Sequence, residues 1–173
     1  MTETLEVEQR RSREPAEKAK DRPSGAALDL VEPPPGARMS EATKRRTRAA
    51  AEAIFARIDG DAIAAPPEDR ITWLVTDLDD FLARVRGQTR VVFLVSLWVV
   101  SVIGPLFVRA FGGLGALPVP RRVEALGKME ESGLAPAVLG VKALLCTLYY
   151  EHPDAAREVG FDGVCLTATK ERA

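Results

Sequence analysis

Three carboxylates, Asp77, Asp79 and Asp80, form the densest group of side chains in this sequence that could transfer protons. A catalytic pair of carboxylates must converge on one substrate to act as general acid and general base. Successive residues of an α-helix are rotated by about 100°, so a helix over this stretch spreads the three groups around its polar side. We therefore predict a solvated helix face here and no catalytic pair.

His152 is the one histidine of the 173 residues, and Cys146 and Cys165 are the two cysteines. Without CxxC spacing, these three side chains fall short of the four ligands that a structural zinc site requires. His152 immediately precedes Pro153, where a helix cap or a surface contact is a more ordinary role than general-base catalysis. We expect reduced thiols, with Cys146 packed in a helix and Cys165 in a C-terminal tail.

Gly113 and Gly115 raise the question of a dinucleotide site. The GxGxxG fingerprint follows a strand, whereas here Pro118 occupies the position of the third glycine and the preceding segment has the pattern of a helix. The sequence also lacks a phosphate-binding loop, a nucleophile elbow and an HExxH motif. We interpret the glycines as a loop that lets backbone segments pass closely, and the chain as a binding component rather than an enzyme.

The segment from Val91 to Val108 is the one that every other element must accommodate. It reads VVFLVSLWVVSVIGPLFV, between Arg90 and Arg109, with no charged residue inside. A helix that is apolar on all sides must lie in a protein core, in a subunit interface or in a bilayer. Its roughly 18 residues are close to the ~20 that cross a ~30 Å hydrocarbon layer. The length of the segment therefore does not distinguish among a protein core, a subunit interface and a bilayer. Gly104-Pro105 should kink or end the straight helix.

The remaining segments predict an all-α fold, an irregular bundle of about five main helices. Ser40 is a suitable N-cap, and the apolar residues after Pro66-Pro67 recur with the 3.6-residue period of one helix stripe. Trp73 points roughly opposite that stripe, so it is either an isolated exposed aromatic side chain or part of a second contact face. The predicted helices cover residues 40–58, 67–86, 88–108, 121–130 and 136–150, followed by a short helical turn over 154–159.

Residues 1–39 differ in composition from the rest of the chain. They alternate acidic and basic side chains, contain Pro33-Pro34-Pro35 and offer few large apolar groups, so burial cannot offset the entropy of ordering them. We predict three parts: a disordered, charged and proline-rich N-terminal arm (1–39), a helical domain (40–163) and a C-terminal tail (164–173).

Two of the predicted helices are apolar nearly all round, in a folded part of only about 120 residues. A domain of that size supports one modest core. Leaving even ~600 Å² of excess apolar area in water would cost about 15 kcal/mol at ~25 cal/mol per Å², which rivals the stability of a whole domain. We therefore expect another protein, lipid or both to cover this surface.

Charge and targeting signals narrow the location and the class of partner. A net charge of −1 and a pI near 6 argue against a nucleic-acid partner. Arg10-Arg11 suggests a twin-arginine export signal, but charged and proline-rich residues follow it in place of an apolar core. We expect a cytoplasmic chain, with the inner face of the membrane as a second place of contact. The first predicted helix has a basic cluster, which is either a solvated helix face or a contact for anionic lipid. The cluster consists of Lys44, Arg45, Arg46 and Arg48.

The stretch from Leu117 to Gly163, about a quarter to a third of the chain, contains a set of spaced short motifs. We call this set the family pattern, and its members are Arg122, Leu126, Ser132, Tyr149-Tyr150 and the turn Gly160-Phe161-Asp162-Gly163. With these motifs the stretch resembles the small helical, cofactor-free component of flavin-dependent glucose-methanol-choline oxidoreductases, as in the small subunit of the gluconate 2-dehydrogenase type. It is also similar to the helical region that precedes the flavin domain in long-chain alcohol oxidases.

This resemblance implies a non-catalytic subunit that packs on and stabilises a separately encoded oxidoreductase of the alcohol, sugar or sterol type. FAD and all catalytic residues would belong to that partner, with no cofactor or metal in this chain. The alternative is a single-span or monotopic membrane-anchored interaction protein, held by residues 91–108. Large aromatic anchors dominate interfaces, so the contact residues we expect are Trp73, Trp98, Phe107, Tyr149, Tyr150 and Phe161.

Overall fold

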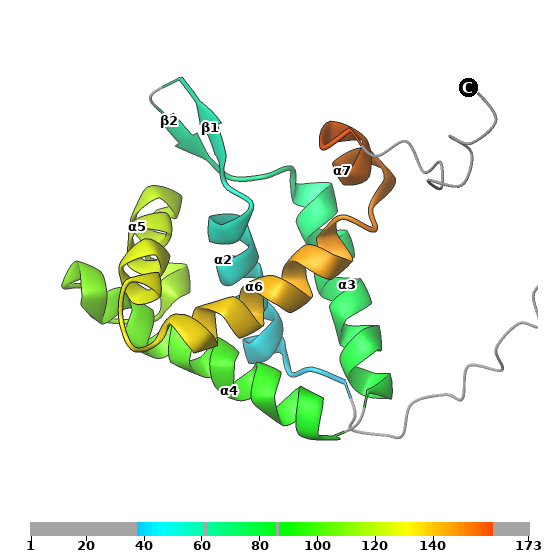
Figure 1. Cartoon of the computed structure of the whole chain (residues 1–173), viewed down its shortest axis with the longest axis horizontal. Coiled ribbons are helices and arrows are strands. Elements are labelled where there is room, and N and C mark those ends of the chain that lie inside the picture. The colour runs from blue at the N-terminus through cyan, green and yellow to red at the C-terminus, as the bar shows by residue number, and fades with distance from the viewer. Residues whose placement is uncertain (1–37, 61, 86, 161–173) are drawn as a thin grey trace, which may run out of the picture. The chain divides into compact units, whose positions relative to one another are not determined.

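The computed structural model describes residues 38–60, 62–85 and 87–160. Within this part the chain forms six α-helices, two short 3₁₀ helices and one antiparallel two-stranded hairpin (Figure 1), so the all-α prediction is confirmed. The predicted arm up to residue 37 and the tail lie outside the described residues. In chain order the elements are α2 (Glu41–Ile54), β1 (Arg57–Asp59), β2 (Ala62–Ala64), α3 (Glu68–Arg84), α4 (Gly87–Ile103), η1 (Gly104–Val108), η2 (Leu114–Ala116), α5 (Val119–Glu130), α6 (Ala135–Tyr149) and α7 (Pro153–Glu158).

The first helix, α2, begins where the sequence predicts and ends earlier. Ser40 Oγ accepts a hydrogen bond from the backbone amide of Thr43 (3.2 Å) and so caps the first turn. The predicted end near Ile58 is wrong, because the chain leaves the helix and forms the β1–β2 hairpin. Ile58 pairs there with Ile63, a β-branched partner of the kind that favours strands, and is 84% exposed. It therefore lies outside the core.

The next helix, α3, presents the predicted apolar stripe to the core. Its members recur at the period of one helix face, and the domain covers all of them fully or in part. The fully buried members and the two half-buried ones, Phe81 and Val85, form the largest single contribution of any helix to the interior. The stripe consists of Ile71, Leu74, Val75, Leu78, Phe81, Leu82 and Val85.

Asp79 departs from the prediction of a solvated carboxylate, because it is only 4% exposed. Its carboxylate accepts a hydrogen bond from the backbone amide of Met39 (2.5 Å) and lies 3.4 Å from the Lys44 ammonium and 3.5 Å from the Arg38 guanidinium. These partners offset the loss of hydration of a buried charge. Met39, which the sequence assigned to the arm, is itself buried in the core. The contact fixes the segment before α2 onto α3.

The central apolar segment is divided at the point that Gly104-Pro105 predicts. After Ile103 the α-helix gives way to η1, a tighter 3₁₀ helix. Gly104 also has a packing role, because a Cβ built there would lie 3.1 Å from the sulfur of Met129 on α5. The missing side chain lets α5 pack closely against the end of the apolar segment.

Helices α2 and α6 hold the bundle together. Each of them contacts α3, α4 and α5, so every long helix touches at least one of the two (Figure 1). The interior is filled mainly by aliphatic side chains, and one stacked aromatic pair, Phe55 and Tyr149, lies at 3.8 Å between ring centroids. Aromatic stacking of this kind adds to the area that the rings bury.

The short helix α7 is held by a cap and by a set of ion pairs. His152 Nδ1 accepts a hydrogen bond from the Asp154 amide (3.3 Å), which confirms the predicted cap. The Glu158 carboxylate accepts hydrogen bonds from Arg70 of α3 (2.6 and 2.9 Å) and from Arg57 of β1 (2.6 and 2.7 Å). Hydrogen bonds from Arg70 and then Arg57 lower the pKa of Glu158 to about 2. One carboxylate therefore joins three elements.

Replacing Glu158 with glutamine should reduce stability at neutral pH more than in acid. A carboxylate whose pKa is lower in the folded chain stabilises the fold above its ordinary pKa of 4.5, and this contribution is lost as the pH falls toward 2. Urea unfolding should therefore show a difference between Glu158→Gln and the wild type that shrinks from pH 7 to pH 3. Glu151→Gln, at an exposed position, is the control and should show no such trend. An equal loss at both pH values for Glu158→Gln would contradict the ion-pair role.

Candidate functional site

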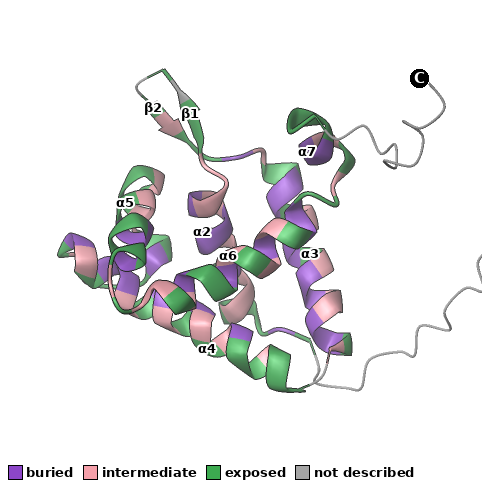
Figure 2. Ribbon diagram, viewed as in Figure 1, coloured by how far each residue is buried: buried purple, intermediate pink, exposed green. Residues whose placement is uncertain are grey.

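An apolar stripe on α4 points away from the domain. One side of the helix is buried in the core, whereas Figure 2 shows exposed residues along much of its length. Four of the exposed apolar side chains follow the i, i+4, i+7, i+11 spacing of one helix face, Val92 lies next to the first of them, and each is between 38% and 59% exposed. We call this set the α4 face: Val91, Val92, Val95, Trp98 and Val102, continued by Leu106 of η1.

Residues 87–108 form the one segment of the described chain that is long and apolar enough to cross a membrane. Yet α4 packs beside α2, and Arg45 and Arg46 of α2 line a groove together with Val102. A spanning α4 would carry these guanidinium groups to bilayer depth, where charged side chains are costly. The arrangement favours a face that lies against a partner or on a membrane surface over a helix that crosses the bilayer.

A groove of about 520 Å³ separates parts of α4 and α6 beside the α4 face. Val92 and Ser96 line it from α4, and Gly140 and Leu144 line it from α6. The two helices approach closely at two small residues, because a Cβ built on Gly140 would lie 3.4 Å from Ser96 Oγ. The groove is therefore an apolar extension of the α4 face.

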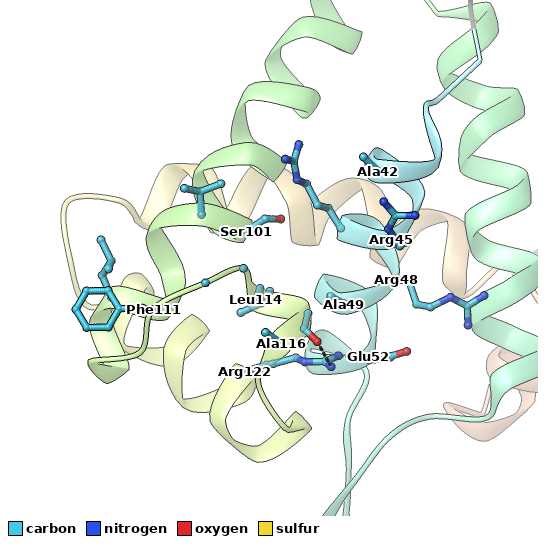
Figure 3. Close-up of a pocket in the computed structure, with 16 residues that line it drawn as sticks. Ala42, Arg45, Arg48, Ala49, Glu52, Ser101, Phe111, Leu114, Ala116 and Arg122 are labelled. Carbon is cyan, nitrogen blue, oxygen red and sulfur yellow. Dashed lines mark hydrogen bonds and ion pairs between the residues drawn. The ribbon is translucent and has the colours of Figure 1, made fainter.

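A second groove, of about 900 Å³, lies between α2, the C-terminal end of α4 and the glycine-containing turn before α5 (Figure 3). Arginines of α2 line one side of it, and Val102 and Phe111 belong to its apolar part. Figure 3 shows Phe111 at one end and Arg45 and Arg48 at the other, with Ser101 between them. We call this feature the basic groove.

Arg122 fixes the turn that closes the basic groove. Its guanidinium forms an ion pair with Glu52 of α2 and donates hydrogen bonds to the carbonyl oxygens of Leu117 (2.7 Å) and Gly115 (3.1 Å). The planar group with its five N–H donors suits such simultaneous contacts better than an ammonium would. Arg122, one of the residues of the family pattern, therefore has a structural role in this turn.

The predicted contact residues do not gather on one surface. Trp98 lies at the centre of the α4 face, and Tyr150 is exposed at the end of α6. Phe107 is half-buried on η1, where it packs against the core. Phe161 lies outside the described residues. Trp98 is thus the predicted anchor that lies within the α4 face.

Tyr149 and Trp73 have partners inside the domain. Tyr149 was expected at a contact surface, but it is 5% exposed and stacked on Phe55, so its ring belongs to the core. Trp73 is half-buried and packs edge-on against the ring of His152, with 5.3 Å between centroids. These intramolecular contacts account for both aromatic side chains without a partner protein.

The aliphatic members of the α4 face were not among the predicted contact residues, which were selected as aromatic anchors. The signal for them was present, because Val91, Val95, Trp98 and Val102 have heptad-like spacing. That signal is hard to read from sequence alone, since the residues between them are also apolar. Only the packing of α2 and α6 on the other sides of α4 shows which residues stay exposed.

The described residues contain no group of three or more histidine, cysteine or acidic side chains placed to hold a metal ion. Cys146 is half-buried on α6, and burial raises the pKa of its thiol, which makes the reactive thiolate scarcer at neutral pH.

The chain matches no protein-family model, no curated protein and no solved structure. The resemblance to the small subunits of flavin oxidoreductases therefore stays a prediction that rests on the residues quoted above.

Gly140→Val should lower the free energy of unfolding by about 1–3 kcal/mol, because a branched side chain would press on Ser96 and separate α4 from α6. Gly127→Val on α5 is the matched control, since nothing lies within 4 Å of a Cβ built at Gly127. Valine is also a slightly better helix former than glycine, so the control should be neutral or stabilising. Urea denaturation measures the free energy of unfolding of both variants. Equal stability of Gly140→Val and Gly127→Val would show that α4 and α6 are not tightly packed at Gly140.

Proposed function

We propose that this chain is a non-catalytic helical subunit that docks the α4 face onto a separate protein. The single observation that carries the proposal is the continuous stripe of half-exposed apolar side chains on a helix whose other side is already buried in the core. Contiguous apolar patches on soluble proteins mark interaction sites, whereas scattered single residues do not.

The energy available from the α4 face sets a condition on the partner. Full burial of one large aliphatic side chain is worth about 1.5–3 kcal/mol, so the five half-exposed aliphatic side chains of the α4 face offer roughly 4–8 kcal/mol. Association itself costs about 4–15 kcal/mol in lost freedom of motion. The aliphatic residues alone barely offset that cost, so Trp98 should insert into a pocket of the partner as the principal anchor.

The family pattern suggests what the partner is. We propose an FAD-dependent oxidoreductase of the glucose-methanol-choline type, acting on an alcohol, sugar or sterol in the cytoplasm, with the FAD and every catalytic residue in that separate chain. The described residues of the pattern have structural environments here. Leu126 is 3% exposed in the core, and Ser132 Oγ accepts a hydrogen bond from the Leu134 amide (3.1 Å) in the turn before α6. The partner is therefore proposed from the resemblance of the sequence alone, while the described residues of the pattern stabilise this domain.

A second candidate function is attachment to the inner face of a membrane, as a monotopic protein. The observation that favours it is the position of Arg45 and Arg46 beside the apolar residue Val102. An apolar helix face with basic side chains at its edge lies in the interface of an anionic bilayer and binds more weakly as salt rises.

Val95→Asp should abolish co-purification of the partner and leave the domain folded, because Val95 is 56% exposed on the α4 face. A charge there would be desolvated in the complex at a cost of several kcal/mol. The measurement is affinity purification of the full tagged chain, with the absorbance spectrum of oxidised flavin and the identity of the bound chain as readouts. Ile58→Asp, on the hairpin, is the matched control and should retain the partner. Circular dichroism checks that both variants keep the helical fold.

Each outcome separates the two candidates. A yellow complex with a glucose-methanol-choline oxidoreductase that Val95→Asp loses and Ile58→Asp keeps supports the subunit proposal. A wild-type chain that sediments with vesicles of phosphatidylglycerol, carries no flavoprotein and is released by Val95→Asp supports the membrane candidate instead. Loss of the partner with Ile58→Asp and not with Val95→Asp would contradict the docking role of the α4 face.

A further inference from the structure

We propose that the basic groove binds an amphiphile, a hydrocarbon chain with an anionic carboxylate or phosphate head. The head would lie against the arginines of α2, and the chain would extend toward Phe111 (Figure 3). This ligand site goes beyond the proposed function, because a subunit that docks through the α4 face has no need of it. The groove volume of about 900 Å³ falls within the range of about 300–1,000 Å³ that is typical of small-molecule sites.

The head end of the groove has two available guanidinium groups. Arg45 and Arg46 are exposed and make no hydrogen bond or ion pair within the described part of the chain. Arg48 differs, because it forms an ion pair with Glu68 and a hydrogen bond with Thr72 (3.2 Å) on α3. Guanidinium groups bind carboxylates and phosphates in a bidentate manner. Because both residues line the same groove, they give it two guanidinium groups that can bind an anionic head.

A buried hydroxyl on the wall of the groove points to a ligand independently of the arginines. Ser101 is 2% exposed, and its Oγ has no hydrogen-bond partner among the described residues. In native structures buried hydroxyls are nearly always paired, so an unpaired one calls for an explanation. Figure 3 shows the Ser101 oxygen pointing toward the space between α4 and α2, where a polar head could pair with it.

The other end of the groove is apolar and uncovered. Leu106 is 55% exposed, Phe111 is 94% exposed, and both line the groove with Val102. Val102 and Leu106 also belong to the α4 face, so the apolar part of the groove is continuous with that face. The separation of a basic end from an apolar end matches the chemistry of an amphiphile rather than that of a free anion.

The described lining of the groove contains one acidic residue, Glu52. Its ion pair with Arg122 offsets the charge that would otherwise repel an anionic head. The floor is made from a turn whose glycines approach the helices closely, since a Cβ on Gly115 would lie 3.5 Å from that of Ala49. Gly112 has a φ of +106°, which side chains disfavour. At its glycines the turn therefore adds no side chain to the groove.

Isothermal titration calorimetry of the full chain with monomeric hexadecanoate tests the proposal. The double variant Arg45→Gln/Arg46→Gln should bind roughly 10- to 100-fold more weakly, the loss typical of charge-assisted hydrogen bonds. Arg84→Gln, at an exposed position near the end of α3, is the matched control and should bind like the wild type. Neither change touches a buried contact, so both variants should fold. Leu106→Gln should weaken hexadecanoate binding without changing how the affinity for hexadecanoate depends on salt concentration.

Further arms identify the source of the ligand. One outcome is that the wild type binds phosphatidylglycerol vesicles and not monomeric hexadecanoate. If Arg45→Gln/Arg46→Gln then loses the vesicle binding, the ligand of the groove is a lipid headgroup in a bilayer. The proposal would be overturned if hexadecanol or inorganic phosphate bound as tightly as hexadecanoate. Equal binding by the wild type and the double arginine variant would also overturn it. So would a wild type that binds neither hexadecanoate nor phosphatidylglycerol vesicles. Val95→Asp should leave hexadecanoate binding intact, so failure of partner docking and failure of this site are distinguishable.

Discussion

A helix that is apolar on every side, inside a domain too small to surround it, is the constraint on which the rest of the structure depends. α2 and α6 cover two flanks of α4, and the buried residues Phe93, Leu97 and Val100 fill the core beneath it. No further element among the described residues lies over the α4 face. The domain therefore folds around α4 and still leaves the α4 face exposed to solvent. This exposure is the physical reason to expect that another molecule binds there.

Sequence periodicity predicted those elements whose character is local. The α3 stripe, the Ser40 cap and the break at Gly104-Pro105 depend on residue type and spacing within one segment, and the structure contains all three. The environments of Asp79 and Tyr149 depend on partners that are distant in sequence. Asp79 is buried because Met39, 40 residues earlier, donates its backbone amide.

The candidate site shows the same division between local and long-range information. The apolar character of α4 was evident, but the sequence could not show which side would face outward, because no polar residue marks it. Arg45, Arg46 and Arg48 read as one basic cluster, yet Arg48 pairs with Glu68 and leaves only two guanidinium groups for the groove. The α4 face and the basic groove share Val102 and Leu106, so an occupant of the groove would change the surface that α4 offers to a partner.

Sedimentation velocity of the isolated 173-residue chain in plain buffer, over a wide range of concentration, tests most directly whether the α4 face needs a cover. Without a partner or lipid, the chain should self-associate, and its weight-average mass should rise with concentration as copies cover one another's exposed apolar residues. A single species at the monomer mass of 18.8 kDa, unchanged at every concentration, would contradict the account.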